Sequence, residues 1–326
     1  MIQRIRDGGG PDPFPGVLTG IGDDTAVLAL TPGAALLATT DLLIEDIHFR
    51  HCWASPRDVG WKAMAVNLSD IAAMGGRPRW ALVALALPAT TPVEAVDEFF
   101  AGMREAGGPH EVAIVGGDTS ASLQGWMINV TLLGEHRGTP ALRSGARAGD
   151  IVAVTGSLGR SAAGLAVLEA GDSASPLGEP WRAELIDAHR RPRPRLAEGR
   201  WLAAQPGVHA MMDLSDGLAT DLGHVCRESG TGARIALDHL PVSPAAIEAA
   251  RALGRDPIAL ATGGGEDYEL LVTFEPTAAD RLVKGLLDAT GTALTAIGRI
   301  EEGGAVTYVD AGGAPVTLAA GYGHFE

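Results

Sequence analysis

The stretch SPRDVGWKAMAVNLSDIAAMGGRPRWALVALALP, residues 55–88, decides the fold class. Ser55 suits a helix N-cap and Pro56 suits the first helical position, so we expect a helix to begin here. Apolar residues then recur at helical spacing until the glycine pair 75–76, which predicts the helix end. Residues 80–87 are almost continuously apolar and predict a buried strand. The stretch therefore indicates a protein that mixes helices with strands.

Predicted helices and strands are also mixed in the sequence before residue 55 and after residue 88. Alternation of these elements is mixed rather than strictly β-α-β, which favours an α+β (mixed α/β) fold over a doubly wound sheet. We expect two lobes, an N-terminal domain at residues 1–148 and a C-terminal α/β domain at 149–326. Strands are predicted at 26–30, 34–40, 112–115, 126–133, 151–155, 210–212, 234–237, 269–274 and 293–300, and helices at 92–106, 161–169, 181–188, 195–204 and 278–289, with a further helix ending at 228.

Composition limits what such a chain does. Its 326 residues are 46% hydrophobic and 20% charged, which allows two sizeable cores. The net charge of −15 argues against nucleic acid or an anionic membrane as the main partner. We expect a cytoplasmic protein, because the first residues lack a signal-like apolar run and no uninterrupted apolar stretch is long enough for a bilayer. Residues 1–15, rich in glycine and proline, predict an irregular arm.

Cysteine and lysine are both rare. Cys52 and Cys226 lie far apart, so neither a disulfide framework nor a zinc site is expected. Lysine occurs only at positions 62 and 284, and no Walker A motif is present. Any phosphate would have to be neutralised by metals, arginines and backbone amides.

Aspartates stand where strands are expected to end or helices to begin. Asp24 stands at the mouth of the strand predicted at 26–30, whereas Asp41 and Asp118 follow predicted strands, and Asp118 comes directly after two glycines. A single aspartate in such a place is most often a cap or turn residue. Asp70 differs, because an aspartate inside an apolar helix is unfavourable unless it is paired or binds a metal. Hard oxygen ligands with almost no histidine or cysteine among them suit Mg²⁺, and Mg²⁺ serves phosphoryl transfer.

Three other features carry weaker signals. Gly263–Gly265 precede Glu266, and three consecutive glycines indicate either a close ligand or a flexible turn. His48 taken alone is more often a structural histidine. Arg143 has the geometry to bind phosphate, although a surface arginine is the simpler interpretation.

Taken together the motifs resemble those of the thiamine-monophosphate kinases, in the superfamily that includes aminoimidazole ribonucleotide synthetase. The stretches that carry the resemblance occur in the family's order from about residue 20 to residue 268, and a family-like GYGHF follows at 321–325. They are GIGDDTAV, TTDLLIEDIHF, KAMAVNLSDIAAMGG, GGDTS, LRSGARAGD, VTGSLGRSAAGL, DLSDGLATDLGH and GGGEDYELL.

The resemblance implies a function and a site. It implies a homodimer paired through the N-terminal lobes, with ATP bound near that interface, and direct transfer of the γ-phosphate to thiamine monophosphate. No protein nucleophile or general base is expected, because the attacking phosphate oxygen is already ionised. The implied Mg²⁺ ligands are Asp24, Thr39, Thr40, Asp41, Asp70, Asp118, Asp213 and Asp216; the implied ATP contacts are Gly117, Arg143 and Ser215; and the implied substrate contacts are His48 and Glu266.

The sequence departs from the family at its ends. The first segment is shorter than is usual, and the aromatic residue that stacks on the substrate in some relatives has Tyr322 as its nearby candidate here.

Two other classes of function remain open at this point. A sister enzyme such as aminoimidazole ribonucleotide synthetase or selenophosphate synthetase would share the aspartates, although the reactive cysteine with its lysine that the latter needs is absent, as is the C-terminal cysteine of the hydrogenase-maturation relative. A non-catalytic nucleotide- or metal-binding module would bind ATP without turnover.

Overall fold

The computed structural model describes residues 14–22, 24–171 and 177–318, and the chain divides into two units. The first unit comprises Met1–Ile71 and Gly76–Thr139, and the second comprises Ala72–Gly75 and Pro140–Glu326. Helices and strands are mixed in both, so the α+β prediction is confirmed. No described helix is long and apolar enough to cross a membrane.

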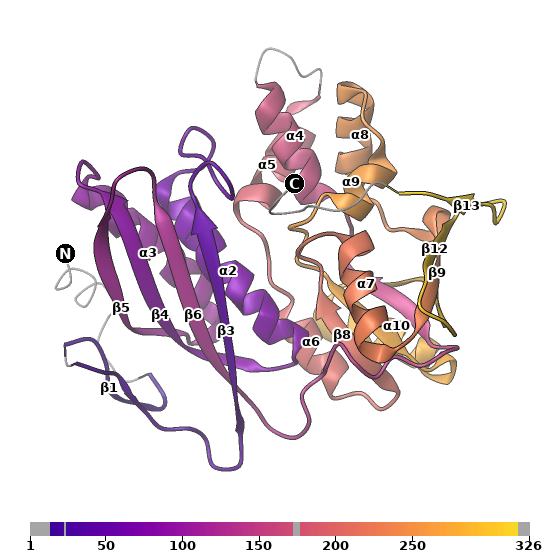
Figure 1. Ribbon diagram of the computed structural model, residues 1–326, viewed down its shortest axis with the longest axis horizontal. Coiled ribbons are helices and arrows are strands. Elements are labelled where there is room, and N and C mark those ends of the chain that lie inside the picture. The colour runs from indigo at the N-terminus through magenta and orange to yellow at the C-terminus, as the bar shows by residue number, and fades with distance from the viewer. Residues whose placement is uncertain (1–13, 23, 172–176, 319–326) are drawn as a thin grey trace. The chain divides into compact units, whose positions relative to one another are not determined.

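The first unit is a four-stranded sheet with two helices on one face (Figure 1). The strands lie in the order β3-β6-β4-β5, and β4 and β5 are parallel while the other pairs are antiparallel. A short hairpin, β1–β2, lies beside this sheet. The elements are β1 Val17–Thr19, β2 Val27–Leu28, β3 Ala35–Ile44, α2 Pro56–Ala73, β4 Arg77–Pro88, α3 Val93–Gly107, β5 Ala113–Ser122 and β6 Met127–His136.

Helix α2 begins where its capping residues predict. The Ser55 hydroxyl accepts from the backbone N–H of Asp58 at 3.2 Å, and the Asp58 carboxylate accepts from the Ser55 N–H at 3.0 Å. This reciprocal pair satisfies two amides that the first turn leaves without helical partners. Gly75, at φ 67°, follows the helix end.

The two faces of the first sheet differ in character. Leu85, Ile128 and Val130 are buried beneath the helices with Leu68 and Phe99. The opposite side, here called the open face, carries the alternate residues, and among the described residues of this unit the β1–β2 hairpin packs on it near Trp80. We define the open face by the residues Thr40, Leu82, Ala84, Asn129 and Thr131, which share it by strand register.

The second unit has a seven-stranded sheet with helices on both faces. Its strands lie in the order β13-β12-β9-β11-β7-β10-β8, and β12 and β9 form the parallel pair. The elements are β7 Ile151–Thr155, α4 Arg160–Ala170, α5 Glu179–Arg190, α6 Leu196–Ala203, β8 Val208–Asp213, α7 Leu218–Ser229, β9 Gly232–Ala236, α8 Pro244–Leu253, α9 Pro257–Gly263, β10 Leu270–Phe274, α10 Ala279–Thr290, β11 Leu294–Glu301, β12 Val306–Val309 and β13 Pro315–Val316.

Alternation along β7 shows how that sheet is covered. Val152 and Val154 belong to the core that includes Leu222 of α7, while Ala153 belongs to the core that includes Leu282 of α10. Successive residues of a strand point to opposite faces, so α7 and α10 cover the two sides. Helices α4, α5, α8 and α9 pack mainly on one another and form a third apolar cluster (Figure 1).

Candidate active site

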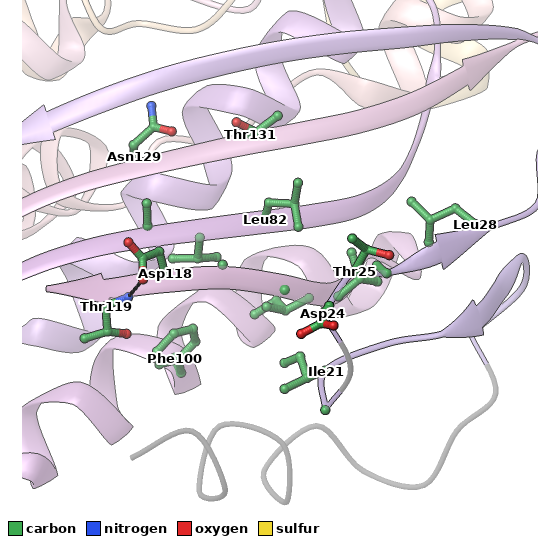
Figure 2. Close-up of a pocket in the computed structure, with 18 residues that line it drawn as sticks. Ile21, Asp24, Thr25, Leu28, Leu82, Phe100, Asp118, Thr119, Asn129 and Thr131 are labelled. Atoms are coloured by element: carbon green, nitrogen blue, oxygen red, sulfur yellow. Dashed lines mark hydrogen bonds between the residues drawn. The ribbon is translucent and has the colours of Figure 1, made fainter.

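A cleft of about 780 Å³ opens in the first unit, along β5 and the open face (Figure 2). Asp24 reaches it from the loop between β1 and β2, and Asp118 reaches it from β5. Asn129 and Thr131 line it from β6. Asp24 was predicted from the motif GIGDDTAV, and Gly117 and Asp118 were predicted from the motif GGDTS. The fold brings the two motifs together at this one cleft.

The glycines before Asp118 had suggested that this residue lies at a strand end, but it lies within a strand. β5 continues from Ala113 through both glycines to Ser122, and Asp118 pairs with Ala84 of β4. Gly117 pairs with Val83 and adopts φ 152°, a conformation that side-chain-bearing residues rarely take. The strand therefore persists because the register with β4 is maintained, although glycine usually weakens a strand.

Thr39, Thr40 and Asp41 also lie within a strand rather than at its end. β3 runs on to Ile44, paired residue by residue with β6. The Thr39 hydroxyl donates to the Asp70 carboxylate of α2, on the covered side of the sheet. The Thr40 hydroxyl points to the other side, where it lies 3.1 Å from the Thr131 hydroxyl. The structure thus joins Thr39 to Asp70 and puts Thr40 on the open face.

His48 follows β3 and has a defined tautomer when neutral. Its Nδ1 accepts the backbone N–H of Ile44 at 3.0 Å. The proton of the neutral ring therefore sits on Nε2, since one imidazole nitrogen donates while the other accepts. Nε2 is the atom with which His48 would donate to a ligand.

The second unit gathers acidic residues at the turn after β8. Asp213 ends β8 and is buried, and Asp216 lies three residues on, before α7. Asp221 in the first turn of α7 accepts from the amides of Asp216 and Gly217, each at 3.1 Å, and so fixes the turn. One oxygen each of Asp216 and Asp221 and a ring nitrogen of His224 lie within 4.8 Å of one another.

Asp221 has an unusual titration. Burial, then the negative charges of Asp213 and Asp216, raises its pKa to about 8. Its other oxygen, Oδ1, is buried and has no hydrogen-bond partner among the described residues. A buried carboxyl oxygen of this kind, beside two further carboxylates, fits a site built for a cation.

The remaining predicted residues of the second unit lie on surface segments. Arg143 is exposed in the segment before β7, and its carbonyl accepts from the Ser229 hydroxyl. Ser215 accepts the Glu266 amide through its backbone carbonyl at 2.7 Å. Glu266 lines a separate cleft of about 330 Å³. Tyr322 lies outside the described residues.

Comparison with known proteins identifies the family. The AIR synthase related protein N-terminal domain matches residues 22–136, and the C-terminal domain of the same family matches 147–310. A thiamine-monophosphate kinase of Rhodopirellula baltica is 37% identical over 88% of this chain and 84% of its own length. One of Aquifex aeolicus is 39% identical over 89% of each. The chain belongs to the thiamine-monophosphate kinase family.

Solved structures agree with this assignment. A thiamine-monophosphate kinase of Stenotrophomonas maltophilia K279a has a TM-score of 0.82 at 35% identity, covering 94% of each chain. A structure described as AaThiL complexed with AMPPCP and TMP has a TM-score of 0.80 at 37% identity, covering 91% of this chain and 89% of that one. The hydrogenase maturation protein HypE of E. coli, at 23% identity and a TM-score of 0.79, shares the fold. The family resemblance predicted from the motifs is confirmed.

Two groups near the predicted residues escaped the sequence interpretation. Asp221 lies in the DLSDGLATDLGH motif, and its place on the face shared with Leu218, Leu222 and Val225 is a signal of burial that the sequence already contains. His189, which contacts Glu266, is 77 positions away in the chain, and no local pattern joins them.

Proposed function

We propose that this protein transfers the γ-phosphate of ATP to thiamine monophosphate, producing thiamine diphosphate and ADP. One observation in the structure carries the assignment: two family motifs, GIGDDTAV with Asp24 and GGDTS with Gly117 and Asp118, line a single cleft of about 780 Å³. Membership of the thiamine-monophosphate kinases supports the substrate. The relative bound to AMPPCP supports ATP as the donor, since AMPPCP is an analogue of ATP.

Magnesium ions are part of the proposal, and the residues fit them. The ligands would be carboxylates and hydroxyls, which are the oxygen donors that Mg²⁺ prefers. The buried Asp221 Oδ1 beside Asp213 and Asp216 adds a reason for a cation in that region. The proposed ligands are Asp24, Thr39, Thr40, Asp41, Asp70, Asp118, Asp213 and Asp216.

Other residues would hold the two substrates. Gly117, Arg143 and Ser215 would contact ATP, and His48 and Glu266 would contact thiamine monophosphate. Arg143 offers a planar donor for phosphate oxygens, and His48 offers its Nε2 proton. Stacking of Tyr322 on the substrate stays a prediction, as does a cytoplasmic location.

The reaction needs alignment more than proton transfer. An oxygen of the thiamine monophosphate phosphate forms a bond to the γ-phosphorus, while the bond from that phosphorus to the β,γ-bridging oxygen breaks and ADP leaves with the electron pair. The attacking phosphate is ionised at neutral pH, so no side chain has to remove a proton. Bound Mg²⁺ would offset the negative charge that gathers on the transferred group.

We also propose a homodimer paired through the open face of the first unit. Large apolar side chains of β3, β4 and β6 are exposed on this face by strand register, and a second copy of the chain would cover them. Leu36, Leu42, Leu82 and Met127 are each between 37% and 51% exposed. Sedimentation or light scattering of the wild type and of Leu42→Glu tests the pairing, with a dimer and a monomer expected respectively.

An assay of the reaction itself tests the function. The protein is incubated with thiamine monophosphate, ATP and Mg²⁺, and the products are separated by chromatography. Equal amounts of thiamine diphosphate and ADP are expected, and Asp70→Asn should lose both. Asp280→Asn, at an exposed position in the first turn of α10, is the matched control. ATP binding without any product from folded wild-type protein would sink the proposal in favour of a binding module.

A further inference from the structure

The loop between α9 and β10 is anchored through each of its acidic side chains. Asp267 accepts the backbone N–H of Gly159 at 2.7 Å, at the start of α4. Glu269 is fully buried and forms two hydrogen bonds with Arg195, at 2.7 and 2.6 Å. Glu266, the first of the three, contacts His189 of α5. The loop is therefore tied to α4, to α5 and to the start of α6.

The backbone of this loop is strained at Glu266 and again two residues later. Glu266 has φ 57° and Tyr268 has φ 50°, both in the left-handed region that residues with side chains rarely adopt. The amides of the two residues are held by the carbonyls of Ser215 and Leu214, at 2.7 and 2.9 Å. Such strain persists only where the surroundings impose it, and it is concentrated at functional sites.

Two buried side chains, His189 and Ser161, contact the Glu266 carboxylate. His189 Nδ1 lies 3.2 Å from Glu266 Oε2, and the Ser161 hydroxyl lies 3.5 Å from the same oxygen. The Ser161 hydroxyl also lies 3.1 Å from His189 Nδ1. The side chain of His189 is 10% exposed, whereas that of Glu266 is 27% exposed.

The protonation of His189 follows from these contacts. A carboxylate can only accept hydrogen bonds, so Nδ1 contacts Glu266 favourably when it carries a proton. In that form Nδ1–H and the Ser161 O–H both donate toward Glu266. The carboxylate is held on its buried side, and Glu266 lines the cleft of about 330 Å³ together with Ser161 and Asp267.

The arrangement does not activate Ser161 as a nucleophile. In a serine-histidine-acid triad the serine and the acid bind opposite nitrogens of the ring, so that a proton passes from one side to the other. Here Ser161 and Glu266 meet the same nitrogen, Nδ1. The group is therefore suited to hold a carboxylate still.

We propose that His189, assisted by Ser161, is a positioning residue that fixes the Glu266 carboxylate for thiamine monophosphate. The inference rests on the proposed function, in which Glu266 contacts that substrate. A carboxylate held in one place would recognise the cationic ring or the amino group of the thiamine portion by charge and by hydrogen bonding. ATP would be unaffected, because His189 would act through Glu266, which is a proposed contact of thiamine monophosphate and not of ATP.

Steady-state kinetics of paired variants test the role. His189→Leu removes the donor at similar bulk, and its KM for thiamine monophosphate should rise about 10-fold or more, the loss expected for one hydrogen bond to a charged group. Its kcat and its KM for ATP should stay within about twofold of wild type. His189→Asn keeps an N–H near the place of Nδ1 and should restore most of the affinity. His239→Leu, at an exposed histidine, is the control.

A double variant separates positioning from structure. In a Glu266→Gln background, adding His189→Leu should change the KM for thiamine monophosphate by less than about twofold, because residues acting as one unit are not additive. Independent effects of the two changes would overturn the proposal, as would equal losses in the Leu and Asn variants. If wild-type protein makes no thiamine diphosphate, the proposed function has failed. Calorimetric titration of thiamine monophosphate into the same variants then decides the positioning role, which equal affinities would overturn.

Discussion

Replacing Gly117 with alanine should destabilise the first unit far more than the same change at Gly116. A Cβ atom at Gly117 would lie 1.8 Å from the carbonyl oxygen of Val83 and 2.7 Å from its carbon, both in the backbone of β4. At Gly116 the new methyl group would meet Leu82 Cδ2 at 3.0 Å. A side-chain end can turn aside, whereas the backbone of a paired strand cannot move without breaking its hydrogen bonds.

The magnitude follows from two terms. Holding alanine at φ 152° costs about 1–3 kcal/mol. The steric overlap adds about 1–3 kcal/mol for overpacking. Their sum, about 2–6 kcal/mol, lowers the melting temperature by roughly 3–9 °C in a protein of this size. Gly116→Ala should stay within about 1 kcal/mol, because a tolerated alanine also restricts the unfolded chain.

Thermal unfolding followed by circular dichroism, with wild type and both variants side by side, measures the difference. Titration with AMPPCP adds a second readout, since Gly117 lines the cleft and Gly117→Ala should lose nucleotide affinity at temperatures where it is still folded. Equal melting temperatures for the two variants would show that β5 does not press against β4 as described.

Three further outcomes are expected. In metal-free protein the free energy of unfolding should fall as pH rises from about 4 to about 8, by up to about 1.4 kcal/mol per pH unit. The reason is that the Asp221 pKa of about 8 lies above its value in the unfolded chain, so the native state keeps the proton to higher pH. Asp221→Asn should flatten this slope in urea titrations at pH 5 and pH 8. Arg195→Met should lower the free energy of unfolding by about 3–5 kcal/mol, because the buried Glu269 carboxylate loses both hydrogen bonds from Arg195. Arg193→Met, at a side chain that is 76% exposed, is the control in the same urea titration, and its free energy of unfolding should change little. Chelation with EDTA should abolish turnover in the chromatographic assay and added Mg²⁺ should restore it, and full activity in EDTA would contradict the metal requirement.

Most helices and strands of the fold could be predicted from local pattern. The cap at Ser55 and the glycines after residue 73 set the bounds of α2, and continuous apolar runs marked β4 and β7. The prediction was poorer where the local preference of a residue differs from the structure that its tertiary neighbours impose. β5 was expected to end before Gly116, because glycine usually interrupts a strand, and pairing with β4 overrides that tendency. The helices α8 and α9 were not predicted, since their apolar residues are mainly small alanines.

The candidate site was predictable as residue types and less so as an arrangement. Asp70 stood out because an apolar helix rarely holds an unpaired carboxylate, and its contact with Thr39 supplies the partner. Nothing local indicates that His189 and Glu266 meet, because that contact depends on how α5 packs against the loop before β10. Contacts of this kind are set by tertiary packing, which a single sequence does not state.

Strand β3 also limits how this protein can change over evolution. Thr39 faces α2 and Thr40 faces the open side, so neighbouring letters of one motif serve opposite surfaces. Substitution at either position alters one surface and leaves the other intact. Deleting or inserting a single residue in Ala35–Ile44 would reverse the faces of all residues on one side of the change, and so turn Leu37 or Leu43 out of the core. Relatives that keep the activity should therefore keep the length of this strand.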